Sequence, residues 1–377
     1  MKLLFISHEP RLNGASKSLL NLIDYLHDKG YEIFVLTQYN KGKFYIELNK
    51  REFIHIIIEP YYYWRQRKTK LGWIKNKLLF PIYRNIINRI SAKKVAKFAI
   101  EQSIDIIHSN TSTINIGAFI SKYSGIPHVW HIREFGDLDF NMNFYQPSDK
   151  VYSFMNRYTN CFIFVSKAVS EHYDSLTESK KKVVYNGIDS NCINEIRHNN
   201  NSRIKILIAG VVYIGKGQDE AVAACNLLIK KGITNFDLYI AGEGKLYFEI
   251  ENDLMSHVHV LGRVDDMIEL RKNIDIELVC SRAEAFGRVT AEAMLSSIPV
   301  IGTNRGGTPE LIRDGIDGFL YEKGDIQQLA DKIETLIKDK SLRISMGQNG
   351  FEKAKNSYLI KHCADEIDKI YKEVSTR

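Results

Sequence analysis

The sequence predicts an α/β protein built from two open domains, each with a parallel sheet covered by helices. Short apolar runs of strand length alternate with amphipathic helical stretches along most of the 377 residues. Runs that are apolar on both faces are typical of parallel strands buried under helices. A polar, Asn-rich stretch at residues 197–202 (RHNNNS) divides the chain into two halves, as an interdomain linker does.

Apolar runs of strand length occur in both halves. In the first half they lie at residues 2–7, 32–37, 53–58, 104–108, 128–131, 161–165 and 182–185. In the second half they lie at residues 204–209, 237–241, 257–261, 274–279, 299–303 and 318–321. Open parallel sheets bind ligands beyond the carboxyl ends of their strands. We therefore expect the two domains to face each other across a cleft, with these strand ends turned toward it.

The domain boundaries follow from the linker. We predict a first domain over residues 1–188, a linker over residues 189–203 and a second domain over residues 204–355. The final helix, about residues 356–377, has a sequence suited to packing on either domain, including back on the first.

Composition excludes several classes of protein. With 44% apolar residues, 26% charged residues and only 7 Pro, the chain is neither disordered nor fibrous. No run approaches the roughly 18 consecutive apolar residues of a membrane span, and no export signal is recognisable. The five cysteines are scattered, which suits buried thiols in a reducing cytoplasm better than disulfides or a zinc site.

The net charge of +7 has a local origin. Residues 61–100 contain eleven Lys and Arg and no Asp or Glu, so the rest of the chain is net acidic. Inside this block an apolar stripe at helical spacing runs from Leu71 to Ile90, and Pro81 is expected to start or kink a helix. A basic amphipathic helix with tryptophans near one end fits an anionic membrane surface. The stripe fits equally well a helix packed on the first domain's sheet with its lysines outside.

The strongest motif is residues 281–294 (SRAEAFGRVTAEAM), which follow a predicted strand and open a helix. Glu284 then lies in the loop and Glu292 about one turn into the helix. The backbone N–H groups at the helix start form a site for an anion, which Gly287 lets come close. Two carboxylates repel phosphate but accept hydrogen bonds from sugar and ribose hydroxyls. The same acids could equally be solvated loop and helix side chains.

Two further glycine loops follow predicted strands. Residues 299–311 (PVIGTNRGGTPEL) combine a strand, paired glycines and a helix start. Paired glycines at such a place permit close approach of the backbone to a ligand, but they are also common as plain turns. Residues 210–217 (GVVYIGKG) fit a P-loop, except that Gly217 stands where a Ser or Thr must hold magnesium, so an ATPase is not indicated. Lys216 could also be an ordinary solvated lysine at a helix start.

Together these residues resemble the retaining nucleotide-sugar glycosyltransferases of family 4, which have the GT-B fold. The resemblance rests on Glu284, Glu292, Phe286 and Gly287, the strand 299–301, the loop 306–310 and residues 317–318, with support from residues 183–189 (VVYNGID) and 13–16 (NGAS). It covers most of the chain and is most specific from residue 281 to 318. It implies two Rossmann-like, doubly wound domains, the first on the acceptor side and the second binding the donor.

The resemblance also implies roles for individual residues. Glu284 would bind hydroxyls of the donor sugar, Glu292 the ribose, and Lys216 the leaving diphosphate. His131, which ends the predicted strand 128–131, would contact the donor sugar or the acceptor. The other donor-binding residues implied are Gly14, Ala15, Gly210, Phe286, Gly287, Arg288, Val289 and Thr290.

One position departs from the family pattern. The family usually carries a basic residue directly after the glycine at position 210, where this chain has Val211. Arg263, Arg282 and Arg288 are the candidates to supply a second cation. Other histidines at strand ends, His8, His108 and His128, are expected to be structural.

The implied reaction moves a sugar from a nucleoside-diphosphate sugar, with UDP favoured, to a hydroxyl of a saccharide or lipid-linked saccharide acceptor. Such transfer would serve the biosynthesis of cell-surface polysaccharides or glycoconjugates. Cations and N–H dipoles would stabilise the leaving diphosphate, so neither a metal nor another cofactor is expected, and the sequence has no Asp-x-Asp at a strand end. We expect a cytoplasmic enzyme, placed at the inner face of the membrane if the basic block docks there.

Two other functions stay open. GT-B scaffolds also host nucleotide-sugar epimerases, which would release free sugar or epimer without an acceptor. Residues 61–68 (YYYWRQRK) mix aromatic side chains with cations, as proteins that bind single-stranded nucleic acids do. No recognition motif accompanies this run, and we expect no nucleic-acid partner.

Overall fold

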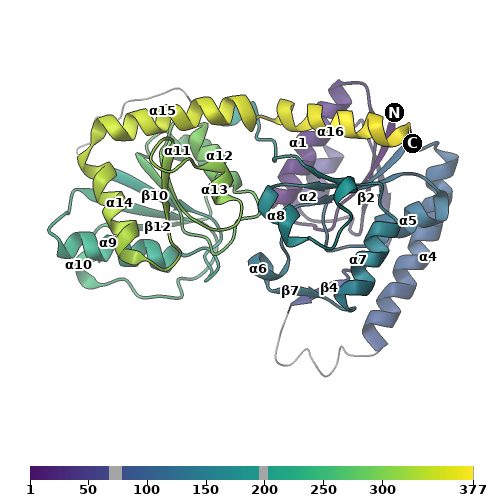
Figure 1. Cartoon of the computed structure of the whole chain (residues 1–377), viewed down its shortest axis with the longest axis horizontal. Coiled ribbons are helices and arrows are strands. Elements are labelled where there is room, and N and C mark those ends of the chain that lie inside the picture. The colour runs from purple at the N-terminus through teal and green to yellow at the C-terminus, as the bar shows by residue number, and fades with distance from the viewer. Residues whose placement is uncertain (68–78, 195–202, 377) are drawn as a thin grey trace. The chain divides into compact units, whose positions relative to one another are not determined.

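The structure is a computed structural model that describes residues 1–67, 79–194 and 203–376 (Figure 1). The chain divides into two compact units. Unit 1 comprises Met1–Gly187 and Ile360–Arg377, and unit 2 comprises Ile188–Leu359. Residues 195–202 of the predicted linker, and residues 71–78 of the predicted stripe, lie outside the described residues.

Unit 1 contains a seven-stranded parallel sheet in the order β3-β2-β1-β5-β6-β8-β9. Its strands are β1 (Lys2–Ile6), β2 (Glu32–Thr37), β3 (Ile54–Ile58), β5 (Ile106–Ser109), β6 (His128–Ile132), β8 (Cys161–Phe164) and β9 (Lys181–Val183). Alternate side chains of β1 enter two different cores, as the pleat of a strand requires. Leu3 and Phe5 pack with helices α1 (Gly14–Asp28) and α16 (Ile360–Ser375). Leu4 and Ile6 pack with α4 (Leu79–Glu101) and α5 (Ile116–Ser124).

Unit 2 contains a six-stranded parallel sheet in the order β12-β11-β10-β13-β14-β15. Its strands are β10 (Ile204–Ala209), β11 (Phe236–Ala241), β12 (Val258–Gly262), β13 (Ile276–Val279), β14 (Val300–Thr303) and β15 (Gly318–Tyr321). Successive strands extend outward from β10 on one side and from β13 on the other. The topological switch point, where open α/β sheets bind ligands, therefore lies between β10 and β13.

Helices cover the sheet of unit 2. Apolar residues of α9 (Gln218–Lys230) and α14 (Ile326–Lys338) share one core with the strands. Helix α12 (Arg288–Met294) contacts β13, β14 and α15 (Lys340–Ser357). The shorter helices of the chain are α2 (Lys43–Asn49), α6 (Asp137–Phe140), α7 (Ser148–Arg157), α8 (Lys167–His172), α10 (Asn252–Met255), α11 (Met267–Arg271) and α13 (Thr308–Leu311).

The predicted class of two open α/β domains with parallel sheets is confirmed. All thirteen predicted strands occur, with ends shifted by at most two residues. The last helix begins later than expected, at Ile360, because Tyr358 and Leu359 leave the helical path to pair with Ile188. The Ile188 N–H donates to the Tyr358 carbonyl at 2.7 Å, and Ile188 forms a β-bridge with Leu359.

Three residues of the aromatic run at residues 61–65 lie in the interior, and Tyr62 and Tyr63 are half-buried. Tyr61 and Trp64 are 2% and 8% exposed, and the indole of Trp64 donates to the Ser112 carbonyl at 2.6 Å. Arg65 is 4% exposed and lies 3.9 Å from the ring of Phe144. These side chains cannot stack on nucleic-acid bases, so the observation that motivated a nucleic-acid partner no longer supports one.

The same run ends in a small antiparallel ribbon that the sequence did not predict. Strand β4 (Arg65–Arg67) pairs with β7 (Met142–Phe144). Each strand has only three residues, which is too short for a recognisable alternation of apolar and polar side chains.

Helix α4 differs from the expectation for the apolar stripe. It begins at Leu79, so Pro81 lies in the first turn, where a missing N–H is tolerated. The face toward the core is made of small residues and one valine: Ala92, Val95, Ala96 and Ala99. The described apolar residues of the stripe are exposed instead, at 57% for Ile82, 50% for Ile86 and 48% for Ile90. The interpretation that the stripe packs on the sheet is therefore wrong for these residues.

In the described part of the chain, none of the helices combines the length and the apolar character that crossing a membrane requires.

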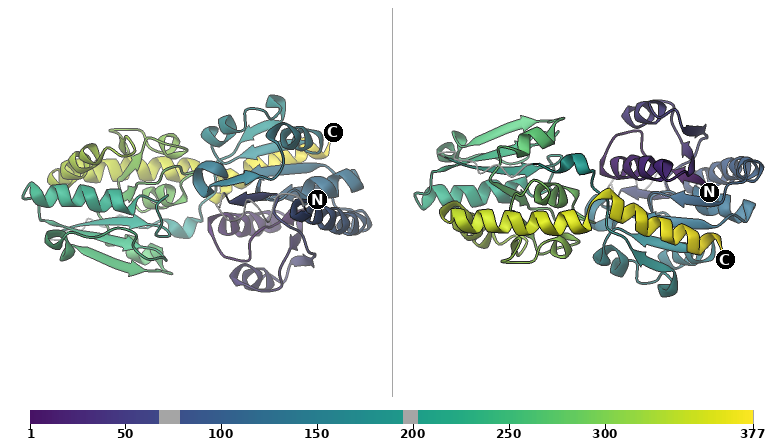
Figure 2. Two further views of the ribbon diagram at one scale, coloured as in Figure 1. Left: turned by 90° about the horizontal axis from the view of Figure 1, so that it is seen from below. Right: turned by 90° about the horizontal axis from the view of Figure 1, so that it is seen from above.

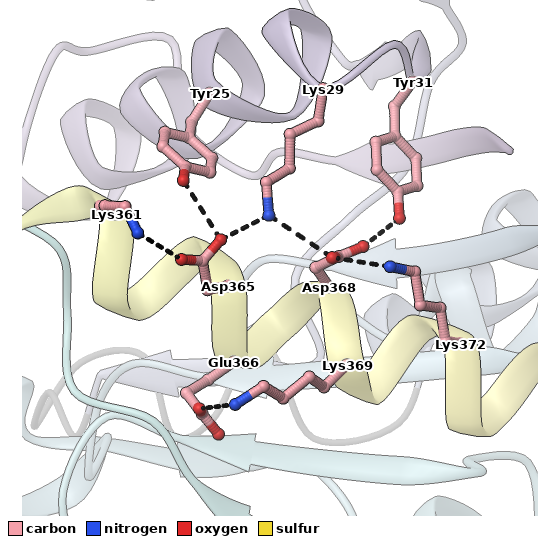
Figure 3. Close-up of polar contacts among 9 residues, drawn as sticks. All are labelled: Tyr25, Lys29, Tyr31, Lys361, Asp365, Glu366, Asp368, Lys369 and Lys372. Atoms are coloured by element: carbon pink, nitrogen blue, oxygen red, sulfur yellow. Dashed lines mark hydrogen bonds and ion pairs between the residues drawn. The ribbon is translucent and has the colours of Figure 1, made fainter.

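Helix α16 closes unit 1 by packing beside α1, as the yellow and purple helices in Figure 2 show. Lys29, directly after α1, donates to carboxylates of both Asp365 and Asp368 (Figure 3). The hydroxyl of Tyr31 also donates to Asp368. Burial raises the pKa of Asp368, but hydrogen bonds from Tyr31 and Lys372 and the charge of Lys29 lower it more, so this pKa lies below its ordinary value.

Asp368→Asn should lower the free energy of unfolding of unit 1 by about 1–3 kcal/mol at pH 7, because the buried Tyr31 hydroxyl and the Lys29 and Lys372 ammonium groups lose a charged acceptor. Since the pKa of Asp368 is lower in the folded state, its contribution is complete above the ordinary pKa of about 4 and is lost as the pH falls below it. Urea unfolding followed by tryptophan fluorescence measures this, because all three tryptophans lie within residues 1–187.

Glu366→Gln is the matched control on the same helix. Glu366 pairs with Lys369 at 2.6 Å, and its side chain is 57% exposed, so its removal should change stability little. An equal loss in both variants would show that α16 does not depend on the buried carboxylate.

Candidate functional site

Three loops meet beyond the carboxyl ends of β10, β13 and β14, beside the switch point of unit 2. They are formed by residues 210–217, 280–287 and 304–307. Backbone hydrogen bonds join them: the Arg282 N–H donates to the Gly215 carbonyl at 2.9 Å, and the Gly307 N–H donates to the Glu284 carbonyl at 2.7 Å. Segments far apart in the sequence therefore form one hydrogen-bonded layer around Glu284.

Two glycines allow these backbones to approach. Gly217 has a φ of +71°, and a Cβ there would lie 2.1 Å from the Cys280 carbonyl oxygen. Gly306 has a φ of +60°, and its Cβ would lie 2.5 Å from the Glu284 carbonyl oxygen. Only glycine fits both positions. The close approach at these two glycines is therefore between two segments of backbone. A Ser or Thr, which a P-loop requires, could not occupy position 217.

The side chains of Lys216 and Glu284 form an ion pair in this layer. The Lys216 ammonium donates to Glu284 Oε1, and the Ser281 hydroxyl donates to the same oxygen at 2.6 Å. The methylene groups of Lys216 lie beside Gly210, which has a φ of +137°; a Cβ there would make ordinary van der Waals contact with them at 3.6 Å. Burial raises the pKa of Glu284, but Lys216 and Ser281 lower it more, so this pKa lies below its ordinary value. Glu284 is therefore a carboxylate at neutral pH.

Glu292 is held between two arginines. Its Oε2 accepts from Arg271 at 3.0 Å, and its Oε1 accepts from Arg288 at 3.1 Å. Arg271 also forms two parallel bonds to Glu277, at 2.9 and 3.0 Å. Burial raises the pKa of Glu277, and Arg271 opposes that rise. This network fixes the carboxylate of Glu292 from both sides.

Arg271 and Glu277 were not among the predicted site residues, although the sequence indicates that Glu277 needs a cationic partner. Glu277 lies in the middle of the apolar strand run 274–279 (IDIELV). An acid at a position buried on both faces needs a cationic partner, and Glu277 is 0% exposed.

Helix α12 begins at Arg288, directly after Gly287, whose φ is +97°. The first N–H groups of a helix have no partner within it. Phe286 is 2% exposed, and its ring meets that of Tyr358 edge to face at 5.7 Å. Thr290 is fully buried, and its hydroxyl has no hydrogen-bond partner within the described ranges. Val289, the remaining predicted donor contact of this loop, is half-buried.

The candidate second cations are not equally available. Arg263 is bound to Glu243 and Asp265 at 2.8 and 2.7 Å, and Arg288 is bound to Glu292. Arg282 is exposed and has no ion-pair partner in the described part of the chain. Its backbone is bonded to the loop that carries Lys216.

In unit 1, hydrogen bonds connect His131 to the start of α1. Arg133 Nη2 donates to His131 Nδ1 at 3.3 Å, and Arg133 Nε donates to Asn110 Oδ1 at 2.6 Å. Asn110 Nδ2 in turn donates to the Ala15 carbonyl at 3.2 Å. Gly14, the first residue of α1, is exposed. The structure thus brings His131 and the first glycine loop into one network, through Asn110 and Arg133, which the sequence analysis had not singled out.

His131 is buried and uncharged. Burial and the charge of Arg133 hold the pKa of His131 well below its usual range. Because Nδ1 accepts from Arg133, Nε2 carries the hydrogen, and that atom has no partner among the residues described. The neighbouring His108 ring lies 5.4 Å away and contacts the Tyr371 hydroxyl at 2.7 Å.

Of the other two strand-end histidines, His128 is buried and His8 is half-buried. His128 Nε2 lies 2.9 Å from the Ser109 hydroxyl and its Nδ1 lies 3.0 Å from the Tyr158 carbonyl. Burial lowers the pKa of His8 as well.

Comparison with known proteins identifies the class. Residues 12–191 match the model for Glycosyltransferase Family 4, and residues 192–353 match the model for Glycosyl transferases group 1. An uncharacterised glycosyltransferase of Methanocaldococcus jannaschii is 28% identical over all of this chain and 99% of its own length. The capsular polysaccharide biosynthesis glycosyltransferase CapM of Staphylococcus aureus is 30% identical over 49% of this chain and 50% of its own.

The fold agrees with this class. The crystal structure of HepE from Anabaena, in complex with UDP and glucose, superposes with a TM-score of 0.76 at 22% identity, over 98% of this chain and 99% of its own. The chain is therefore a glycosyltransferase with the GT-B fold, a class that acts on nucleotide sugars. It belongs to family 4, as the motifs predicted.

Gly306→Ala should lower glycosyl transfer by about 100-fold, because its Cβ would push the backbone of Glu284 away. Initial rates of transfer from a nucleotide-sugar donor measure this. Gly315→Ala is the matched control: Gly315 also has a positive φ, +75°, but a Cβ there meets nothing within 4 Å. Gly315→Ala should cost about 1 kcal/mol of stability through backbone strain, and Gly306→Ala should cost more, because its Cβ also meets the Glu284 backbone. If both variants transfer sugar at the same rate, the loop does not position Glu284.

Proposed function

We propose that the protein transfers a sugar from a nucleoside-diphosphate sugar to a hydroxyl, and that Lys216 and Glu284 bind the two halves of the donor. The contact between these two side chains carries the proposal. In the donor, sugar and diphosphate share one bridging oxygen, so groups that bind the two halves must lie within a few ångströms of each other. An ammonium and a carboxylate in contact at a switch point meet that requirement.

On donor binding, Lys216 exchanges the Glu284 carboxylate for a phosphate oxygen. The carboxylate is then free to accept hydrogen bonds from sugar hydroxyls. As the bond from the anomeric carbon to the bridging oxygen breaks, the acceptor oxygen bonds to the anomeric carbon, and its hydroxyl proton passes to the released diphosphate. The diphosphate takes the electron pair of the broken bond and gains charge. Lys216 and the N–H groups of Phe286, Gly287, Arg288 and Val289 stabilise that charge. This charge supply makes a divalent metal unnecessary, so EDTA should leave the reaction intact.

The nucleotide binds beside the same loop. Glu292, held by Arg271 and Arg288, accepts the ribose hydroxyls, and the preorganised carboxylate loses little freedom in doing so. The structure of HepE with UDP and glucose supports a UDP-sugar as the donor. Retention of the anomeric configuration follows from the family resemblance.

In unit 1 we assign the acceptor side. His131 Nε2–H is a buried donor whose hydrogen bond is unmade among the described residues, and a hydroxyl of the donor sugar or the acceptor would satisfy it. By the family resemblance, Gly14 and Ala15 at the start of α1 would be further donor-binding residues. The acceptor is a saccharide or a lipid-linked saccharide of cell-surface polysaccharide synthesis, which the relationship to CapM supports.

Lys216→Ala and Glu284→Ala should each lower transfer by about 100- to 1000-fold, because each removes a contact to the reacting part of the donor. A thermal-shift panel of nucleoside diphosphates first identifies the base, since a ligand at 100 times its Kd adds about 2.7 kcal/mol of stability. Transfer from the matching sugar, in buffer with EDTA, is then assayed with saccharide acceptors.

Lys230→Ala and Glu249→Ala serve as controls, since both residues are exposed in the same unit and should leave transfer unchanged. Undiminished turnover in the Lys216 or Glu284 variant contradicts the assignment. Release of free sugar or epimer at the full rate without any acceptor would show an epimerase instead.

Arg282 is the residue we assign as the second diphosphate cation, because Arg263 and Arg288 are held by carboxylates. Arg282→Ala should raise the KM for the donor by about tenfold, the effect of one lost charge-assisted hydrogen bond. Arg305→Ala removes another exposed arginine from the neighbouring loop and should change KM little. The assignment is wrong if the Arg305 variant loses affinity and the Arg282 variant does not.

A further inference from the structure

Helix α4 has two different faces, and only one of them is needed for the core of unit 1. Small side chains face the sheet and α5, as described above. On the opposite face, residues at helical spacing are 48–57% exposed: Ile82, Tyr83, Ile86, Ile90 and Ile100. Scattered exposed apolar residues are ordinary, but a stripe of them along one helix marks an interaction surface. We call this set the outer face of α4.

Cations accompany the outer face. Arg89, Lys93, Lys94 and Lys97 are exposed along the same helix. Lys94 and Lys97 meet Glu59 and Glu101 only at 3.7 and 3.8 Å. Neither Arg89 nor Lys93 has an ion-pair partner within the described ranges. With 100° per residue, the cations fall on the same side as the isoleucines. From Ile82 to Lys97 this surface is about 22 Å long.

We propose that the outer face of α4 docks the enzyme on an anionic lipid surface. The isoleucines would enter the boundary between headgroups and acyl chains, and the cations would pair with lipid phosphates. This inference rests on the proposed function and deepens it: the enzyme would meet its acceptor at a lipid surface.

Charge complementarity favours lipid over a second copy of this chain. A symmetric dimer through this face would bring the four cations toward their own equivalents, because the same patch is used on both subunits. Like charges would then oppose the contact, whereas phosphates of an anionic bilayer would neutralise them. Residues 61–100 contain no Asp or Glu, so no acidic side chain of this block would repel an anionic surface.

Co-sedimentation of the full chain with vesicles tests the proposal. We expect binding to vesicles of equal phosphatidylglycerol and phosphatidylcholine and little binding to pure phosphatidylcholine. Arg89→Gln with Lys93→Gln should weaken partitioning by roughly 30-fold at low salt, since each cation near an anionic surface contributes a factor of about five. Ile86→Ser with Ile90→Ser should weaken it by about tenfold or more. In 1 M salt, where the Debye length is about 3 Å, the preference for anionic vesicles should disappear.

Matched controls exist in the same unit. Lys41→Gln with Lys43→Gln removes two exposed cations at the start of α2, and Ile46→Ser removes an isoleucine that is 54% exposed. Both should bind vesicles as the wild type does. All replaced side chains are exposed, so unchanged thermal midpoints verify folding.

Three results would overturn the proposal. They are equal binding to anionic and neutral vesicles, equal losses in the control variants, and concentration-dependent dimerisation that disappears in the Ile86 and Ile90 variant without any vesicle binding. Transfer to a water-soluble saccharide is a separate readout. If it persists while vesicle binding fails, only the docking surface is wrong, and if it fails while vesicle binding persists, only the proposed function is.

Discussion

The ion pair between Lys216 and Glu284 is the contact around which the site of unit 2 is organised. Neither side chain could reach the other unless the loops after β10 and β13 came together, and the order of the strands makes them neighbours at the switch point. Gly217 and Gly306 then let three backbones touch where any Cβ would collide. The buried network of Arg271 and Glu277 sets Glu292 one helical turn further on. The positions of Lys216 and Glu284 therefore depend on how the backbones of the surrounding loops pack.

Unit 1 is organised by a different constraint, the return of the last helix. Helix α16 completes the core that covers β1 and β5, and its carboxylates bind Lys29 and Tyr31. Tyr371 of the same helix reaches the ring of His108, which packs against His131. His131, the predicted acceptor-side histidine, is thus linked to α16 through His108 and Tyr371. A change in α16 would affect this region as well as stability.

Much of the fold could be read from the sequence, because parallel strands buried on both faces leave continuous apolar runs. The site motif at residues 281–294 was equally legible, since strand, loop glycine and helix start follow one another. Other features depend on contacts that no local pattern contains. The paired glycines at 306 and 307 predicted a close approach, but only the structure shows that Glu284 is what they approach. Helix α4 was ambiguous because both of its faces are apolar, and small alanines rather than the isoleucines fit under the sheet. The three-residue strands of the β4 and β7 ribbon carry no periodic signal at all.

The central claim is that Lys216 and Glu284 together bind the junction of diphosphate and sugar. A crystal structure with an unreactive UDP-sugar analogue tests it most directly. We expect Lys216 Nζ to have left Glu284 and to lie about 2.7–2.9 Å from a phosphate oxygen, with the Glu284 carboxylate accepting from a sugar hydroxyl. A donor bound with its diphosphate elsewhere, while Lys216 and Glu284 remain paired, would contradict it.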